Sequence, residues 1–174
     1  NLNTIKTILL ALCIFFTPEI VLASSADKKA MDGMEFYRKK DFDQASQKFL
    51  EAHNGKPKDP KISYNLGNSH YKQGKFEKAL NNYSILLNHK TNAATKQKSA
   101  YNTGNTLYRM GKIEESILSY KKALELDPND MDAKFNLEFV LKKNKEKQAE
   151  QQKKNKSEID KKDQDFNNQK NQNQ

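Results

Sequence analysis

The chain has 174 residues, a net charge of +9 and a charged fraction of 30%, while only 35% of its residues are hydrophobic. This composition leaves room for one modest folded domain with non-globular ends. Its single cysteine, Cys13, allows no disulfide within the chain. The hydrophobic residues crowd at the N-terminus, recur periodically to about Leu141 and then nearly vanish.

Residues 1–25 have the pattern of a secretory signal peptide. Lys6 precedes an uninterrupted apolar run from residue 8 to 16, Pro18 ends that run, and Ala23 closes a Val-Leu-Ala cleavage pattern. The run is short for a membrane span, which needs about 20 apolar residues. We therefore expect an exported protein of the bacterial periplasm or cell envelope. Cleavage near Ala23 and retention as an N-terminal anchor are the two alternatives.

Helical periodicity begins at about Asp27, and a small residue marks each of three similar segments. These residues, Gly33, Gly67 and Gly104, are 34 and 37 positions apart. Residues 101–130 show the unit clearly, as two amphipathic helices joined by a tight turn. One such pair is too thin to bury its own apolar stripe, so the sequence predicts a stack of helical pairs.

A period near 34 with a helix–turn–helix unit resembles the tetratricopeptide-repeat family. Small, aromatic and turn residues carry the resemblance: Gly33, Phe36, Ala45, Phe49, Ala52 and Pro57; Leu66, Gly67, Tyr71, Gly74, Ala79 and Tyr83; Gly104, Tyr108, Gly111, Tyr120, Ala123 and Pro128. The resemblance implies an all-α fold, an α-solenoid of three repeats with a C-terminal capping helix. The expected boundaries are 26–59, 60–93 and 97–130 for the repeats, 131–151 for the cap and 152–174 for a disordered tail.

Each residue type in the repeats has an expected packing role. The three mid-helix glycines should let the partner helix approach closely, and Phe49, Tyr83 and Tyr120 should fill the space between neighbouring repeats. Gly74 and Gly111 suit the left-handed conformation that ends a helix.

Three departures from the repeat pattern carry structural expectations. Lys40 stands where the turn glycine of the first repeat would be. Extra residues follow the second repeat, so 88–95 is either a longer loop or a place where the helix runs on by a turn. From residue 142 onward the chain is almost entirely Lys, Asn, Gln, Asp and Glu. Such a segment buries too little apolar surface to offset its ordering entropy, so we expect disorder beyond about Gln151.

No catalytic constellation stands out in the sequence. His53, His70 and His89 are scattered without metal-ligand spacing. The GKFEKA and GKIEES segments begin helices after a turn and are not phosphate-binding loops. We predict a non-enzymatic protein with no cofactor and no metal site. Basic residues alternate with acidic ones, which indicates solvated helix faces and not a nucleic-acid partner.

In tetratricopeptide stacks the first helices of the repeats line a concave groove. Asparagine amides there can bond a peptide backbone, tyrosines supply contact area, and cations attract carboxylates. The alternative is that the Asn and Tyr residues are kept for packing between helices. The residues that the resemblance places in the groove are Asn65, Asn68, Tyr71, Lys72, Lys98, Tyr101, Asn102, Asn105, Tyr108, Arg109 and Asn136.

One subclass of the family grips a chaperone's C-terminal carboxylate with a Lys–Asn–Asn–Lys–Arg clamp. Asn65 and Lys98 match two of its positions. Ala30, Met34 and Asn102 stand where its Lys, Asn and Arg would be. The clamp is incomplete, so we do not predict that ligand.

A narrower resemblance is to the exported repeat proteins of bacterial aerotolerance (Bat) operons. The shared segments are YNLGNSHYKQGKFEKAL, YNTGNTLYRMGKIEESI, YKKALELDPND and DAKFNLEFV. The resemblance implies a scaffold acting with membrane von Willebrand A-domain proteins in envelope stress tolerance. The alternative function is a periplasmic accessory factor of secretion, pilus or cell-wall assembly that uses its convex face or tail.

Overall fold

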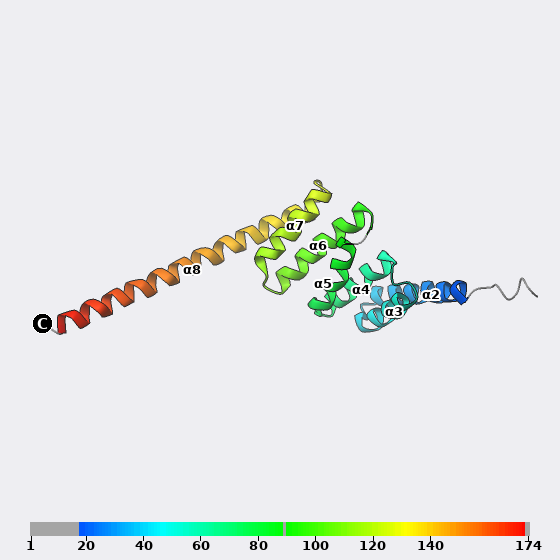
Figure 1. Ribbon diagram of the computed structural model, residues 1–174, viewed down its shortest axis with the longest axis horizontal. Helices are drawn as coiled ribbons and strands as arrows, with labels where there is room; N and C mark the ends of the chain where they lie inside the picture. The colour runs from blue at the N-terminus through cyan, green and yellow to red at the C-terminus, as the bar shows by residue number, and fades with distance from the viewer. Residues whose placement is uncertain (1–17, 89, 173–174) are drawn as a thin grey trace, which may run out of the picture.

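The computed structural model describes residues 18–88 and 90–172 of the chain. These residues form seven α-helices and no strand, which confirms the predicted all-α fold. Figure 1 shows α2 to α7 as a row of helical pairs, from which α8 extends. The helices are α2 (Pro18–Arg38), α3 (Phe42–Gly55), α4 (Pro60–Lys72), α5 (Phe76–Asn88), α6 (Ala93–Arg109), α7 (Ile113–Leu126) and α8 (Met131–Gln172).

Local sequence signals explain where these helices begin. The side chains of Asp41, Asp59 and Asn92 accept hydrogen bonds from free backbone N–H groups at the starts of α3, α4 and α6. Pro60 occupies the first turn of α4, where its missing N–H costs nothing.

The tight turns inside the repeats have the predicted left-handed residues. Gly74 and Gly111 have φ angles of 75° and 76°. Lys40 occupies the equivalent turn of the first repeat with a φ of 62°, although it carries a side chain. The first repeat therefore keeps the turn geometry of the others at some conformational cost.

The mid-helix glycines lie against the large aromatic residues, as predicted. A Cβ atom on Gly67 would lie 2.7 Å from Tyr83, and one on Gly104 would lie 2.7 Å from Tyr120. Phe49, in the first repeat, is fully buried in a cluster with Leu66 of the next repeat. The contact between glycine and ring sets the distance between the helices of a pair, and the ring then packs toward the following layer.

The extra residues after the second repeat lengthen a helix. α6 has 17 residues where α4 has 13, and the additional turn is at its N-terminus. The third repeat thus begins at Ala93, one turn before the expected boundary at residue 97. The Gln97 side chain, which directly follows this added turn, donates a hydrogen bond to the carboxylate of Asp130, just before α8.

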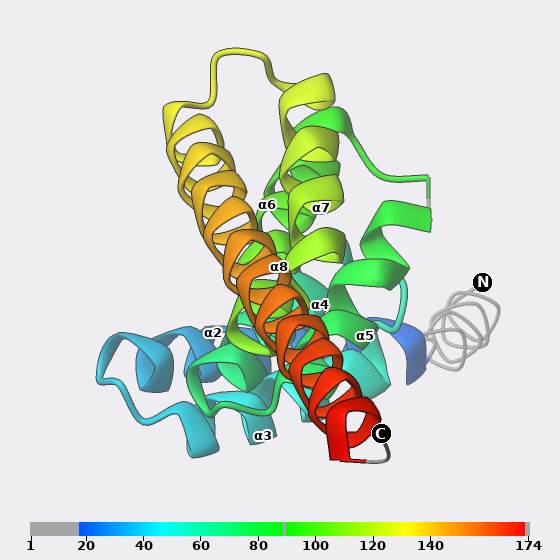
Figure 2. The ribbon, with the colours of Figure 1, turned by 90° about the vertical axis from the view of Figure 1, so that its left-hand side faces the viewer.

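The last helix differs from the sequence prediction. α8 has 42 residues and remains helical to Gln172, where the sequence predicts a disordered tail from residue 152. Its first turns pack on α7 through the buried residues Ala133 and Val140. Figure 1 shows the rest extending away from the stack, and in Figure 2 it runs toward the viewer in front of the other helices. Lys, Glu and Gln are strong helix formers, so this stretch needs no buried face to be helical.

None of the helices in the described ranges is long and apolar enough to cross a membrane. The predicted signal segment, residues 1–25, lies mostly outside those ranges, and only its last residues belong to α2. The signal peptide therefore stays a prediction.

Candidate functional site

Most of the predicted groove residues line two adjoining cavities along α4, α6 and α8. One cavity, of about 370 Å³, is lined by Tyr37, Asn68, Tyr71, Lys72, Tyr83, Asn102 and Asn105. The other, of about 340 Å³, is lined by Tyr71, Asn105, Tyr108, Arg109, Tyr120, Phe135, Asn136, Phe139 and Val140. Tyr71 and Asn105 belong to both, so the two cavities form one surface, which we call the central groove.

The remaining predicted residues lie elsewhere. Asn65 and Lys98 line a separate hollow of about 260 Å³ between the starts of α4 and α6. Tyr101 lines none of these cavities and packs against Tyr120, with ring centroids 6.0 Å apart. The eleven residues are thus not gathered at one site, although most of them share the central groove.

The asparagines of the groove bond to one another and to tyrosine hydroxyls. Asn102 on α6 donates from Nδ2 to the Tyr64 hydroxyl (3.0 Å) and to Asn68 Oδ1 (2.9 Å) on α4. The Tyr83 hydroxyl on α5 donates to the same Asn68 oxygen at 2.8 Å. One cluster of four polar groups therefore joins α4, α5 and α6.

The next junction repeats the arrangement. Asn136 on α8 donates from Nδ2 to the Tyr101 hydroxyl (3.1 Å) and to Asn105 Oδ1 (3.0 Å) on α6. The Tyr120 hydroxyl on α7 donates to Asn105 Oδ1 at 2.7 Å. We call these two equivalent clusters the asparagine ladder. Both N–H donors of Asn102 and of Asn136 are used in it.

The tyrosine hydroxyls are the part of the ladder that sequence reasoning missed. Burial raises the pKa values of Tyr83 and Tyr120 well above the ordinary tyrosine value, because a buried phenolate is poorly solvated. Burial also raises the pKa of Tyr64. These hydroxyls therefore stay protonated across the physiological range and remain hydrogen-bond donors. The signal was present in the sequence, because Tyr64 and Tyr83 recur 37 positions later as Tyr101 and Tyr120.

The α6–α8 end of the central groove is aromatic and cationic. Tyr108 meets Phe139 edge-on at 5.7 Å, and Phe135 is 69% exposed. The Arg109 guanidinium lies 5.6 Å from the centre of the Phe76 ring. Lys72 and Arg109 make no ion pair with another described residue, and no carboxylate lines either cavity. The groove can therefore offer positive charge beside an apolar surface.

Metal binding has no support in the described part of the chain. No group of three His, Cys, Asp or Glu side chains there is arranged to hold an ion.

Comparisons with known proteins agree with this architecture. A family model described as "TPR repeat" matches residues 33–74 and 104–145. Among solved structures, the first TPR domain of Spaghetti (RPAP3) bound to the HSP90 peptide SRMEEVD is 20% identical, with a TM-score of 0.61 over 69% of this chain and 93% of that chain. The Sgt2 TPR domain from Aspergillus fumigatus is also 20% identical, with a TM-score of 0.65 over 71% of this chain and 82% of that chain.

A TPR2AB-domain complex of yeast Sti1 with pHSP90 is 25% identical, with a TM-score of 0.66 over 73% of this chain and 50% of that chain. This chain thus spans about half the length of the yeast domain pair. No curated protein sequence matches it significantly. The repeated helical pairs, the matched segments and these structural neighbours together show that the chain carries tetratricopeptide repeats and has their fold.

Proposed function

We propose that this protein is a non-enzymatic scaffold that binds an extended segment of a partner protein in the central groove. The observation that carries the proposal is a continuous groove with exposed aromatic side chains and free cations. Exposed apolar groups on a rigid concave surface are common at recognition sites. Two of the similar solved structures hold HSP90-derived partners, which supports a peptide ligand of some kind here.

The mode of recognition that we propose differs from the carboxylate clamp. Ala30 and Met34 on α2 cannot supply the Lys and Asn of that clamp. The cations of the central groove, Lys72 and Arg109, lie in the last turns of α4 and α6. They favour a segment that carries a carboxylate, and the neighbouring Phe135 favours an apolar side chain beside it.

We place this function in the bacterial envelope. The signal-like pattern of residues 1–25 supports export. The resemblance to the Bat repeat proteins supports von Willebrand A-domain partners and a role in stress or aerotolerance. Adjacent genes for A-domain proteins and a MoxR-like ATPase would agree with this assignment, and their absence would count against it.

Capture of partners from an envelope extract tests the groove. The double variant Lys72→Ala/Arg109→Ala removes both free cations of the groove. Lys121→Ala/Lys122→Ala removes two exposed cations from α7 and serves as the matched control. We expect the groove variant to lose the captured partners and the control to keep them. Retention of every partner by the groove variant would refute the proposal.

The alternative function, an accessory factor that acts through its tail, draws support from α8. This helix projects from the stack, and Ile159 on it is 58% exposed. Deletion of residues 152–174 should then abolish partner capture, while the Lys72/Arg109 variant should leave it unchanged. The two proposals therefore predict opposite results in the same assay.

A further inference from the structure

We propose that the junction of the first two repeats, between α2 and α4, is a separate subsite for a basic and aliphatic stretch of the partner protein. The proposal rests on the proposed function, because it assumes a partner segment along the first helices. It concerns a different surface from the central groove, so the two can be tested apart.

The asparagine ladder is missing at this junction. The positions equivalent to Tyr64, Asn68 and Tyr83, which are 34 residues earlier, hold Ala30, Met34 and Phe49. None of these three side chains can accept or donate the ladder's hydrogen bonds. Asn65, the counterpart of Asn102, consequently makes no side-chain hydrogen bond to any described residue.

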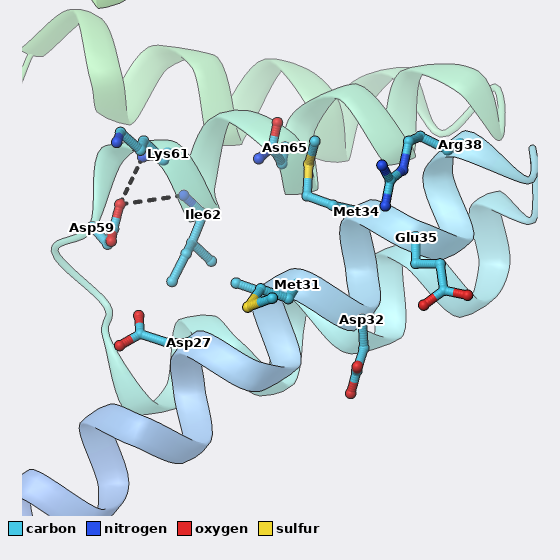
Figure 3. Close-up of a pocket in the computed structure, with 11 residues that line it drawn as sticks. Asp27, Met31, Asp32, Met34, Glu35, Arg38, Asp59, Lys61, Ile62 and Asn65 are labelled. Atoms are coloured by element: carbon cyan, nitrogen blue, oxygen red, sulfur yellow. Dashed lines mark hydrogen bonds between the residues drawn. The ribbon is translucent and has the colours of Figure 1, made fainter.

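An open hollow takes the place of the ladder. Its volume is about 650 Å³, compared with about 370 and 340 Å³ for the cavities at the following junctions. Met31 and Met34 on α2 are 72% and 41% exposed, and the buried side chain of Ile62 lies across from them. Figure 3 shows these three side chains and Asn65 around the same opening. Flexible methionines suit an apolar side chain that enters from outside.

The hollow is lined by more carboxylates than cations, unlike the central groove, which no carboxylate lines. Four carboxylates and two cations line it, and one of the four, Glu35, pairs with Lys39 outside the lining at 2.6 Å. The carboxylates of Asp27 and Asp59 lie near Ile62 and Met31 (Figure 3). Asp59 caps α4 and Asp27 pairs with Lys56 at 2.6 Å, yet the Asp27 side chain remains 59% exposed. A lysine or arginine beside an aliphatic residue complements this surface.

The free Asn65 amide indicates the backbone form of the occupant. In the ladder the equivalent amide of Asn102 donates to one amide carbonyl oxygen and one tyrosine hydroxyl oxygen, so the two N–H groups of Asn65 are suited to oxygen acceptors of a partner. An extended segment offers free backbone carbonyls, whereas the carbonyls in the middle of a helix are already bonded. The subsite is therefore suited to an extended basic segment and not to a docked helix, such as α8 of a second copy.

Fluorescence anisotropy of the full chain with two labelled nonapeptides tests the charge preference. Both peptides carry leucines flanked by glycine and serine, and they differ only in having lysine or glutamate between the leucines. We expect the lysine peptide to bind at least about tenfold more tightly. Absence of binding, or equal binding of both peptides, would overturn the proposal.

A variant that rebuilds the ladder tests the location. Ala30→Tyr/Met34→Asn/Phe49→Tyr supplies the missing groups, fills the hollow and engages Asn65. We expect it to lose about tenfold or more in affinity for the lysine peptide while its melting temperature stays the same or rises. Loss of binding with a lowered melting temperature would reflect misfolding, so single-charge variants provide the second measurement.

Asp27→Asn and Asp43→Asn each remove one carboxylate that pairs with a lysine, but only Asp27 lines the hollow. We expect Asp27→Asn to weaken lysine-peptide binding and Asp43→Asn to leave it unchanged. Equal effects of the two variants on lysine-peptide binding would overturn the subsite. It would also be overturned if neither peptide binds while the chain self-associates and the ladder-rebuilding variant does not. The proposed function is tested separately, and it fails if the Lys72/Arg109 variant still captures every partner.

Discussion

Asn105 shows how one side chain can fix the position of three helices. Its Oδ1 atom lies on α6 and accepts hydrogen bonds from Tyr120 on α7 and Asn136 on α8. Asn68 has the same role for α4, α5 and α6. An oxygen that accepts two directional bonds restricts rotation as well as distance, which apolar packing alone does not.

Replacement of Asn105 by alanine should therefore destabilise the domain. The Tyr120 hydroxyl would lose its acceptor while the residue stays 1% exposed, and an unsatisfied buried polar group costs about 1–3 kcal/mol. Urea unfolding followed by circular dichroism measures the change. Asn81→Ala, at an exposed position of α5, is the control and should stay within about 0.5 kcal/mol of the wild type. Similar losses of unfolding free energy in both variants would show that the hydrogen bonds of the ladder contribute no more to stability than an exposed side chain does.

Lys40 offers a stabilising substitution at the first turn. It adopts a φ of 62°, and a residue with a side chain pays roughly 1–2 kcal/mol for the left-handed conformation. Lys40→Gly should therefore raise the free energy of unfolding by about 1 kcal/mol. Lys39→Gly, one residue earlier and without a positive φ, should not stabilise the protein. A lower melting temperature for Lys40→Gly would mean that its side chain contributes more than its backbone strain costs.

At the level of the helices, the sequence predicted the pairs better than the contacts between them. The spacing of Gly33, Gly67 and Gly104 located three helical pairs, because close packing against a ring requires a small residue at a fixed place. The hydrogen bonds of Asn102 and Asn136 were not predicted, because they depend on how each pair is rotated against the next. The pattern of the groove residues did not distinguish side chains that face solvent from those that bond to a neighbouring repeat.

The end of α8 was predicted wrongly for a related reason. Few apolar residues after Leu141 argued against a packed segment, but a helix can form without packing where its residues favour it. The ion pair of Lys143 with Glu146, at 2.9 Å, adds local support along the exposed face. The absence of an apolar stripe excludes a buried helix, but it does not exclude a helix that is exposed to solvent.

Deletion of residues 152–174 should separate helix content from domain stability. The removed part makes no buried contact among the residues whose burial is described. The melting temperature should stay within about 1 °C, because exposed surface positions contribute little to unfolding free energy. The far-ultraviolet ellipticity at 222 nm should fall by the share of helix that is lost. An unchanged helical signal per molecule would contradict the extended α8.

Across the whole molecule, coupling between neighbouring repeats is uneven. Solenoid stability is the sum of the stabilities of the single repeats and of the contacts between neighbours. The junctions of α4–α5 with α6 and of α6–α7 with α8 have a ladder cluster. The junction of α2–α3 with α4 has none, and Gln73 at the end of α4 joins it instead by donating to the Phe42 carbonyl oxygen, Asp43 and Ser46 at the start of α3. Without the ladder, the first repeat should open more readily than the third, which leaves the hollow beside Met34 adaptable to a partner.

Native-state hydrogen exchange can measure this gradient. Amides of α3 should exchange through openings that cost about 1–3 kcal/mol less than those of α7, because each missing net hydrogen bond is worth about 0.5–1.5 kcal/mol. A terminal repeat also frays for lack of one neighbour, so the comparison needs a variant of the same repeat. Ala30→Tyr/Met34→Asn/Phe49→Tyr keeps the chain end and adds only the ladder groups. Protection should rise in α3 and stay constant in α7, whereas an unchanged α3 would mean that the chain end, and not the missing ladder, sets the gradient.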